Sequence, residues 1–378
     1  MQALRFAHAE LPPSCHRVRE EIRAFLREHL PERSAAQRAL SWTAFDAAFS
    51  RKLGGHGFLG MTFPEAYGGR GMSALERYVV IEELLAAGAP VAAHWMADRQ
   101  SGPLLLRFGS EHLKRTFLPR IARGEAYFCI GMSEPDTGSD LASVRTSAVR
   151  VPGGFIVNGT KLWGTHVTRS PHMIALVRTQ SGLPQKHAGL SQLLIDLDCP
   201  GITVRPVLDL LGHDHFGEVT FEEAFVPEER LIGSAGAGWQ QVVAELGLER
   251  SGPERILSSF ELLRQLATVA SEPEQELLLG SLCGRLSVLR QMSLSVAARL
   301  SRGEEVGVQA AIVKELGTSF EQALPQAIHD VLGTPAMLEG GDTLMQVHAV
   351  ISQLAPSYSL RGGTREILRG IIAKELLR

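Results

Sequence analysis

The chain has 378 residues, of which 44% are hydrophobic and 6% aromatic, and it carries a formal net charge of −3 at pH 7. This length and apolar content allow two or three domains with cores of their own. The slightly acidic balance, without a basic stripe, argues against nucleic acid or a membrane surface as a partner. Since neither a leader pattern nor a run of about 18 apolar residues is present, we expect a cytoplasmic protein. The four cysteines lack the spacing of a disulfide framework or a metal site.

The first third of the chain predicts helices. Val18, Ile22 and Leu26 recur at helical spacing ahead of Pro31, which predicts a helix over residues 14–30. The same pattern predicts further helices over residues 42–53, 73–87, 91–108 and 110–123. Gly-rich or Pro-rich breaks separate these helices, so we expect an all-α domain over residues 1–124.

Between residues 125 and 232 the apolar pattern changes toward the alternation of β-strands. Pro152-Gly153-Gly154 predicts a hairpin turn, and Asn158-Gly159 predicts a second turn. Strands are predicted around residues 149–157, 173–177, 193–197 and 219–225. This part of the chain is therefore expected to form a middle β-domain.

The helical period returns after the glycine-rich run at residues 233–238 and holds to the C-terminus, which predicts a third, helical domain over residues 233–378. Helices are predicted over residues 239–249, 254–269, 274–301, 308–331 and 364–377. Because helices and strands are segregated along the chain, the fold class is α+β and not a doubly wound sheet.

A polar loop from Gly131 to Asp140 follows an apolar strand at the start of the middle domain. Its backbone N–H groups, hydroxyls and glycines suit a flat, polar and partly anionic ligand. A structural turn capped by Ser133 and Ser139 is the simpler alternative. A tight hairpin and the run Trp163-Gly164-Thr165 come after the loop.

This stretch, residues 127–165, resembles the central β-domain of the acyl-CoA dehydrogenase family, and the resemblance covers nearly the whole chain. It implies an N-terminal helical domain, a middle domain of barrel-like sheets and a C-terminal four-helix bundle. It also implies FAD as cofactor, an acyl-CoA as substrate and an electron-transfer flavoprotein as electron acceptor.

The resemblance assigns cofactor contacts to both motifs. Ile130, Met132 and Ser133 match positions at the pyrimidine end of the flavin, where N–H donors stabilise the negative charge of the reduced ring. Trp163 and Thr165 match the element beside the flavin N5 edge. A further match, Ser139, is implied to lie near the flavin pyrophosphate and the substrate thioester.

The catalytic base departs from the commonest family pattern. Gly362 stands where most members carry a glutamate, and a glycine cannot take a proton. Isovaleryl-type and long-chain-type members carry the base on a helix instead, and Glu249 matches that position. The resemblance thus implies Glu249 as the base, with Arg250 and Gly362 in contact with substrate. Alternatively, Glu249 is a solvated helix glutamate paired with a charged neighbour such as Arg250, Glu254 or Arg255. Arg250 would then be an exposed charge on the helix.

The adenine side of the cofactor site is altered. The family's Arg-x-x-Phe-Gly element is missing between Leu263 and Arg285, whereas Gly333, Thr364 and Glu366 match positions on that side. Two explanations remain open. Other contacts compensate in a homo-oligomer, a dimer or tetramer, or a different subunit of a heterotetramer supplies the missing arginine.

The resemblance implies FAD-dependent α,β-dehydrogenation of an acyl-CoA thioester to the trans-2-enoyl-CoA. The small residue at Gly362 is expected to leave room beside the substrate α-carbon, which favours a branched or bulky acyl group. The alternative is a non-catalytic or partner-dependent subunit of a heteromeric acyl-CoA dehydrogenase.

Overall fold

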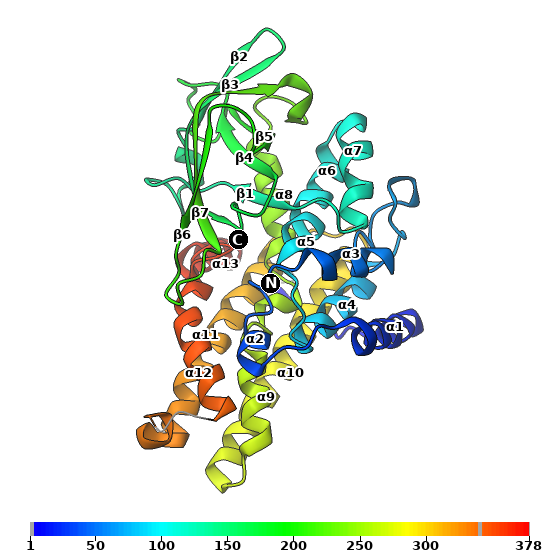
Figure 1. The fold of residues 1–378 in the computed structure, drawn as a ribbon, viewed down its shortest axis with the longest axis vertical. Coiled ribbons are helices and arrows are strands. Elements are labelled where there is room, and N and C mark those ends of the chain that lie inside the picture. The colour runs from blue at the N-terminus through cyan, green and yellow to red at the C-terminus, as the bar shows by residue number, and fades with distance from the viewer. Residues whose placement is uncertain (1–3, 339–341, 378) are drawn as a thin grey trace. The chain divides into compact units, whose positions relative to one another are not determined.

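The computed structural model describes residues 4–338 and 342–377 and divides into two compact units (Figure 1). One unit is helical and consists of Met1–Phe45, Met72–Val91 and Gly247–Arg378. The other consists of Asp46–Gly71 and Ala92–Leu246 and contains the sheet. Helices, then strands, then helices follow one another along the chain, which confirms the predicted α+β class. The division into domains at residues 1–124, 125–232 and 233–378 stays a prediction.

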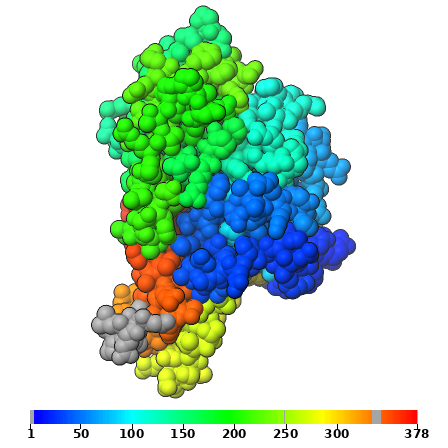
Figure 2. Space-filling view, viewed as in Figure 1, coloured from blue at the N-terminus to red at the C-terminus, as the bar shows by residue number. Residues whose placement is uncertain are grey.

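The sheet has eight strands in the order β6-β7-β3-β2-β4-β5-β8, with β1 paired to β4. The strands are β1 (Phe128–Gly131), β2 (Ser147–Val151), β3 (Gly154–Thr165), β4 (His172–Arg178), β5 (Leu190–Asp196), β6 (Ile202–Val207), β7 (Phe216–Pro227) and β8 (Leu231–Ile232). The pairs β1 with β4 and β2 with β4 are parallel, and the other pairs are antiparallel. Alternating side chains such as Phe155, Val157 and Phe221 form a buried core. The part of the chain that contains β6 and β7 is coloured green on the surface in Figure 2.

One predicted turn is found and the other is wrong. Pro152 and Gly153 form the turn between β2 and β3, as predicted. Asn158 and Gly159 instead lie inside β3, where the pairing with β7 shifts register. The Asn158 amide is bonded in both directions to Glu223, accepting from its N–H at 2.8 Å and donating to its carboxylate at 2.6 Å. Val157 pairs with Ala224 and Gly159 with Phe221, so β7 carries one extra residue opposite Asn158 and the chain does not reverse at Asn158-Gly159.

Helices of the sheet unit begin where capping residues allow. The predicted helix over 42–53 starts only at Ala47, because the Asp46 side chain accepts from the Phe49 N–H and caps the helix there. The predicted helix over 91–108 is interrupted by a π-helical turn over Ala97–Ser101. The helices are α3 (Ala47–Gly55), α5 (Ala92–Met96), α6 (Gly102–Phe108), α7 (Glu111–Ala122) and most of α8 (Gly238–Glu249), whose residues from Gly247 onward belong to the helical unit.

The helical unit is built on long helices, of which α10 and α11 run side by side (Figure 1). Its helices are α1 (Pro13–His29), α2 (Ala35–Ala39), α4 (Ala74–Ala86), α9 (Phe260–Val269), α10 (Pro273–Ser301), α11 (Gly307–Leu338), α12 (Thr343–Leu354) and α13 (Arg365–Leu376). The prediction missed α2 and α12, and α9 begins later than predicted because a short 3-10 turn, η6 (Pro253–Arg255), precedes it. No helix among the described residues is both long and apolar enough to cross a lipid bilayer.

Candidate active site

The two motifs of the sheet unit lie next to each other. The Leu162 N–H donates to the Ser133 carbonyl at 2.9 Å, and the Lys161 ammonium donates to the Met132 carbonyl at 3.1 Å. A Cβ at Gly164 would lie 3.6 Å from the Ile130 carbonyl oxygen. The structure thus brings the end of β1 and the loop after it against the second half of β3.

A buried ion pair holds this arrangement. Lys161 and Glu134 are joined at 2.8 Å, with side chains only 1% and 6% exposed. The Glu134 carboxylate also accepts from the N–H groups of Arg145 and Thr146. Burial lowers the pKa of Lys161 to about 8, against the attraction of Glu134. Burial alone would raise the pKa of Glu134, but Lys161 and these donors bring it below its usual value.

Trp163 is the most unusual residue of this part of the structure. Its side chain is 55% exposed and its φ is 65°. A positive φ is strained for a bulky side chain, and such strain is retained mainly where the surroundings enforce it, often at ligand sites. Phe216 packs edge-on against the indole at 5.9 Å, and Thr165 is half-buried two residues later.

These features fit the isoalloxazine ring that the resemblance implies. The exposed indole of Trp163 offers a flat apolar face, and Ser133 offers a half-buried hydroxyl beside the backbone of the loop. Such a surface suits a flat ring with a polar edge. Ser139 is exposed farther along the same loop. The roles of Ile130, Met132, Ser133, Ser139, Trp163 and Thr165 as cofactor contacts stay predictions.

The helical unit contains a second constellation, at the end of α8. The Glu249 carboxylate is bonded to the Arg255 guanidinium at 2.8 Å, and the Arg255 Nε donates to the Glu249 carbonyl at 3.0 Å. The side chains of Glu249 and Arg255 are 12% and 1% exposed. Glu249 therefore has a charged partner, as the simpler alternative expected, but its side chain is mostly buried and not solvated.

Gly362 lies directly against this ion pair. A Cβ added to Gly362 would lie 2.9 Å from Arg255 Nη2 and 3.3 Å from Glu249 Oε1. The structure therefore brings together the two positions that the sequence offered for the base. It also corrects one reason given for a bulky substrate, because the space beside Gly362 is filled by Arg255 and Glu249.

Arg250 belongs to the same constellation. Its side chain is buried, at 7% exposure, and its Nε donates to the Gly362 carbonyl at 2.9 Å. Burial lowers the pKa of Arg250. The alternative of an exposed helix charge is wrong for this residue, while its contact with substrate stays a prediction.

Further buried charges surround Glu249. Lys314 on α11 donates to the Thr318 hydroxyl and to the Tyr358 carbonyl, both at 2.7 Å, and burial lowers its pKa to about 6. Arg361 stacks on Trp42 and Tyr358, with centroid distances of 4.8 and 4.4 Å. Sequence reasoning missed the buried cations Arg255, Lys314 and Lys161. Only Lys314 gave a signal in the sequence, as a charge that follows the apolar run at residues 310–313.

The residues that match the adenine side of the cofactor site lie in α11 and at the start of α13. Thr364 precedes α13 and its hydroxyl bonds to Glu366, whose pKa is lowered by its own backbone N–H and by Thr364. Gly333, with φ of 76°, breaks the helical path of α11. The start of α10 carries Glu272, Glu274 and Glu276, which do not fit a pyrophosphate. The positions matched by Gly333, Thr364 and Glu366 stay predictions.

The chain is similar to known proteins over nearly its whole length. Family models match residues 12–125 (Acyl-CoA dehydrogenase, N-terminal domain), 129–224 (middle domain) and 236–377 (C-terminal domain). Acyl-CoA dehydrogenase IpdE1 of Mycobacterium tuberculosis is 33% identical over 374 residues, which cover 95% of this chain and 96% of the relative. A mitochondrial isovaleryl-CoA dehydrogenase of Solanum tuberosum is 30% identical over 64% of this chain and 60% of its own length. The solved ChsE4-ChsE5 complex from M. tuberculosis superposes with a TM-score of 0.83 at 28% identity, covering 98% of this chain and 99% of the solved one.

The ion pair in the sheet unit can be tested by removing one charge or both. Lys161→Met leaves the Glu134 carboxylate buried without its cation, which costs about 3–5 kcal/mol in comparable sites. We expect a lower thermal unfolding midpoint and less bound flavin. Adding Glu134→Gln to Lys161→Met removes both charges and should recover part of the loss. A single variant that melts at the wild-type temperature would contradict this role of the pair.

Proposed function

The chain belongs to the acyl-CoA dehydrogenase family of FAD-dependent oxidoreductases that act on CH–CH groups, and from this we propose that it oxidises a branched or bulky acyl-CoA to the trans-2-enoyl-CoA with Glu249 as base. The observation that carries the proposal is the contact between Glu249 and Gly362, since a side chain at 362 would lie 3.3 Å from the Glu249 carboxylate. A glutamate side chain at 362 would start in tight contact with the Glu249 carboxylate, so the two positions serve the same place.

In the proposed reaction the Glu249 carboxylate takes the proton from the α-carbon of the thioester. Backbone N–H near Gly362 polarises the thioester carbonyl, and Arg250 fixes that backbone through its bond to the Gly362 carbonyl. The apolar acyl chain excludes water from Glu249, and desolvation makes a carboxylate a stronger base.

Trp163, Thr165 and the loop at Met132 and Ser133 are proposed to hold the isoalloxazine ring. The chemistry that FAD supplies when bound is acceptance of the β-hydrogen as a hydride. With Glu249 as the proton acceptor and FAD as the hydride acceptor, the substrate would lose two hydrogens and two electrons. We propose an electron-transfer flavoprotein as the acceptor that removes these electrons afterwards.

Two relatives support the proposed substrate class. The isovaleryl-CoA dehydrogenases of Solanum tuberosum and Oryza sativa, which act on a branched acyl group by name, are each 30% identical to this chain. The absence of a side chain at Gly362 gives no additional room for a bulky acyl group, because Arg255 occupies the space beside it.

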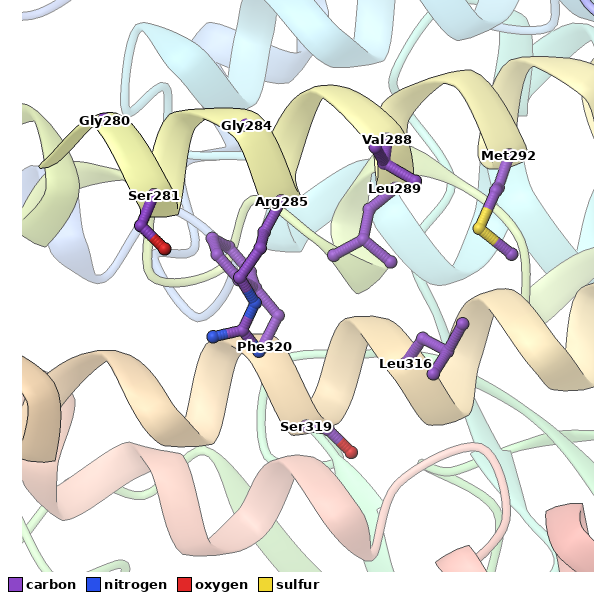
Figure 3. Close-up of a pocket in the computed structure, with 10 residues that line it drawn as sticks. All are labelled: Gly280, Ser281, Gly284, Arg285, Val288, Leu289, Met292, Leu316, Ser319 and Phe320. Carbon is purple, nitrogen blue, oxygen red and sulfur yellow. The ribbon is translucent and has the colours of Figure 1, made fainter. Parts of the chain in front are cut away.

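We also propose that the protein works as an oligomer in which a second copy covers the groove between α10 and α11 (Figure 3). The groove has a volume of about 430 Å³. Val288 and Leu316 line it and are 61% and 44% exposed, and Gly280 and Gly284 leave the backbone of α10 open to close approach. Arg285 lies over the Phe320 ring inside the groove.

The second candidate function, a subunit that depends on a different partner for catalysis, is favoured by the acidic start of α10. Glu274 and Glu276 stand in the first turn of that helix, in the region where the resemblance places the family's Arg-x-x-Phe-Gly element, which this chain lacks. A partner chain would then supply that element. The ChsE4-ChsE5 relative is itself a complex of two named components.

An absorbance spectrum of the purified protein tests the proposal as a whole. We expect the spectrum of bound FAD, and we expect anaerobic bleaching by isovaleryl-CoA or a bulkier acyl-CoA at a higher rate than by straight-chain acyl-CoAs. Bound FAD that no acyl-CoA in the panel bleaches would favour the partner-dependent subunit. Faster bleaching by straight chains would refute the substrate class alone.

Replacing the proposed base separates chemistry from cofactor binding. Glu249→Gln keeps the side-chain shape but cannot take a proton, so we expect turnover to fall by at least about 1,000-fold while FAD stays bound. Glu245→Gln is the matched control, because Glu245 lies one turn earlier on α8 and bonds to the Gln192 amide at 3.0 Å. Substantial turnover by Glu249→Gln would exclude it as the base.

The oligomer is tested with a charge in the groove. Val288→Lys places an ammonium group on an apolar surface that the proposal buries, so the apparent mass by light scattering should fall. Val149→Lys, on β2, is the control, because Val149 is similarly exposed at 59% but lies outside the groove. An unchanged mass for Val288→Lys would exclude this groove as the interface, and co-purification of a second chain would indicate a heteromer.

A further inference from the structure

Arg255 is a fully buried arginine that has no assigned role in the proposed reaction. It belongs to η6, the short turn between α8 and α9, and its side chain is 1% exposed. A buried guanidinium is costly unless hydrogen bonds and an opposite charge compensate for the lost water. A residue of this kind therefore depends on a specific set of partners.

The two hydrogen bonds of the Arg255 guanidinium within the described residues both go to Glu249. Its Nε donates to the Glu249 carbonyl at 3.0 Å and its Nη2 donates to the Glu249 carboxylate at 2.8 Å. Because the guanidinium is rigid and planar, these two bonds fix the Glu249 side chain relative to its own backbone. A lysine has a single, flexible ammonium group and cannot impose the same geometry.

The location of the Arg255 guanidinium depends on the glycine at 362. A Cβ there would lie 2.9 Å from Nη2 and 3.4 Å from Cζ of Arg255. Trp42 packs against the guanidinium of Arg255 at 5.8 Å and against that of Arg361, the residue before Gly362, at 4.8 Å. Arg255 therefore occupies the space that a side chain at position 362 would need.

We propose that Arg255 is the positioning residue of the base: lodged in the space left by Gly362, it holds the Glu249 carboxylate in the orientation that takes the α-proton. The inference rests on the proposed function and extends it, since it makes the residues at 249, 255 and 362 one interdependent set. Catalysis with a base on α8 then requires an arginine at 255 as well as a glycine at 362.

Other charged groups near Glu249 have different partners. Arg250 donates to the Gly362 carbonyl, and Lys314 donates to the Tyr358 carbonyl. The nearby pair Arg361 and Glu321 lies 3.7 Å apart. Burial lowers the pKa of Lys314 to about 6, whereas an arginine stays protonated in proteins. Arg255 is thus a permanent cation that donates directly to the Glu249 carboxylate.

The first test compares Arg255→Gln and Arg255→Lys with a control, Arg290→Gln, in the full-length protein loaded with FAD. Arg290 is half-buried and pairs with Glu82 at 2.6 Å. For Arg255→Gln we expect bound FAD, a KM within about threefold of wild type, and a kcat about 100-fold lower, as for a misplaced catalytic group. The acidic limb of the pH profile of kcat should move to higher pH, because the carboxylate has lost its cation. Arg255→Lys should restore the acidic limb but only part of kcat.

The second test is a double-mutant cycle with Gly362→Ala, which remains informative if Arg255→Gln is destabilised. The methyl group of Gly362→Ala would displace Arg255, so we expect the combined variant to lose less activity than the sum of the two single losses. The strain of an alanine at φ of 69° is present with or without Arg255 and cancels in the cycle.

The outcomes distinguish this inference from the proposed function. If Glu249→Gln is inactive while Arg255→Gln retains the wild-type kcat and pH profile, Arg255 does not position the base and the proposed function stands. If the effects of Arg255→Gln and Gly362→Ala add without coupling, the inference is likewise refuted. If Glu249→Gln is active, the proposed base itself is wrong. Loss of kcat with an equal loss in Arg290→Gln would show a merely structural effect.

Discussion

The bond between Glu249 and Arg255 is the constraint on which the helical unit's candidate site depends. Two charges that are 12% and 1% exposed have given up most of their hydration, so each is tolerated only while the other is in place. That requirement links the end of α8 and the turn η6 that follows it to the loop at Gly362, which is far away in sequence. A side chain at position 362 would occupy the space of the ion pair and would therefore disturb the end of α8, η6 and the loop at Gly362 together.

The sheet unit solves a similar problem in the same way. Its loop of hydroxyls and glycines has little apolar surface with which to pack, yet a ligand site needs a fixed backbone. The buried pair of Glu134 and Lys161 provides the fixed point, because the carboxylate binds two backbone N–H groups and the ammonium binds the Met132 carbonyl. In both units an ion pair, and not the predicted ligand contacts themselves, orders the candidate residues.

Sequence reasoning predicted what depends on local pattern. Helical periodicity placed α1, α10 and α13 to within a residue or two, and matching motifs pointed to Glu249 and Gly362 as alternatives for one position. Sequence reasoning failed where a residue distant in sequence determines the local structure. Asn158-Gly159 has the chemistry of a turn, but bonds to Glu223 keep it within β3. An absent side chain at 362 is visible in the sequence, whereas the arginine that fills its space is visible only in the structure.

The start of α10 has a consequence for whatever surface meets it. Glu272, Glu274 and Glu276 are exposed around the N-terminal end of that helix, where negative charge offsets the positive end of the helix dipole. The helix is thereby stabilised by its own sequence and needs no bound anion at that end. The local potential is negative, so a basic surface would be attracted to it and an acidic one repelled.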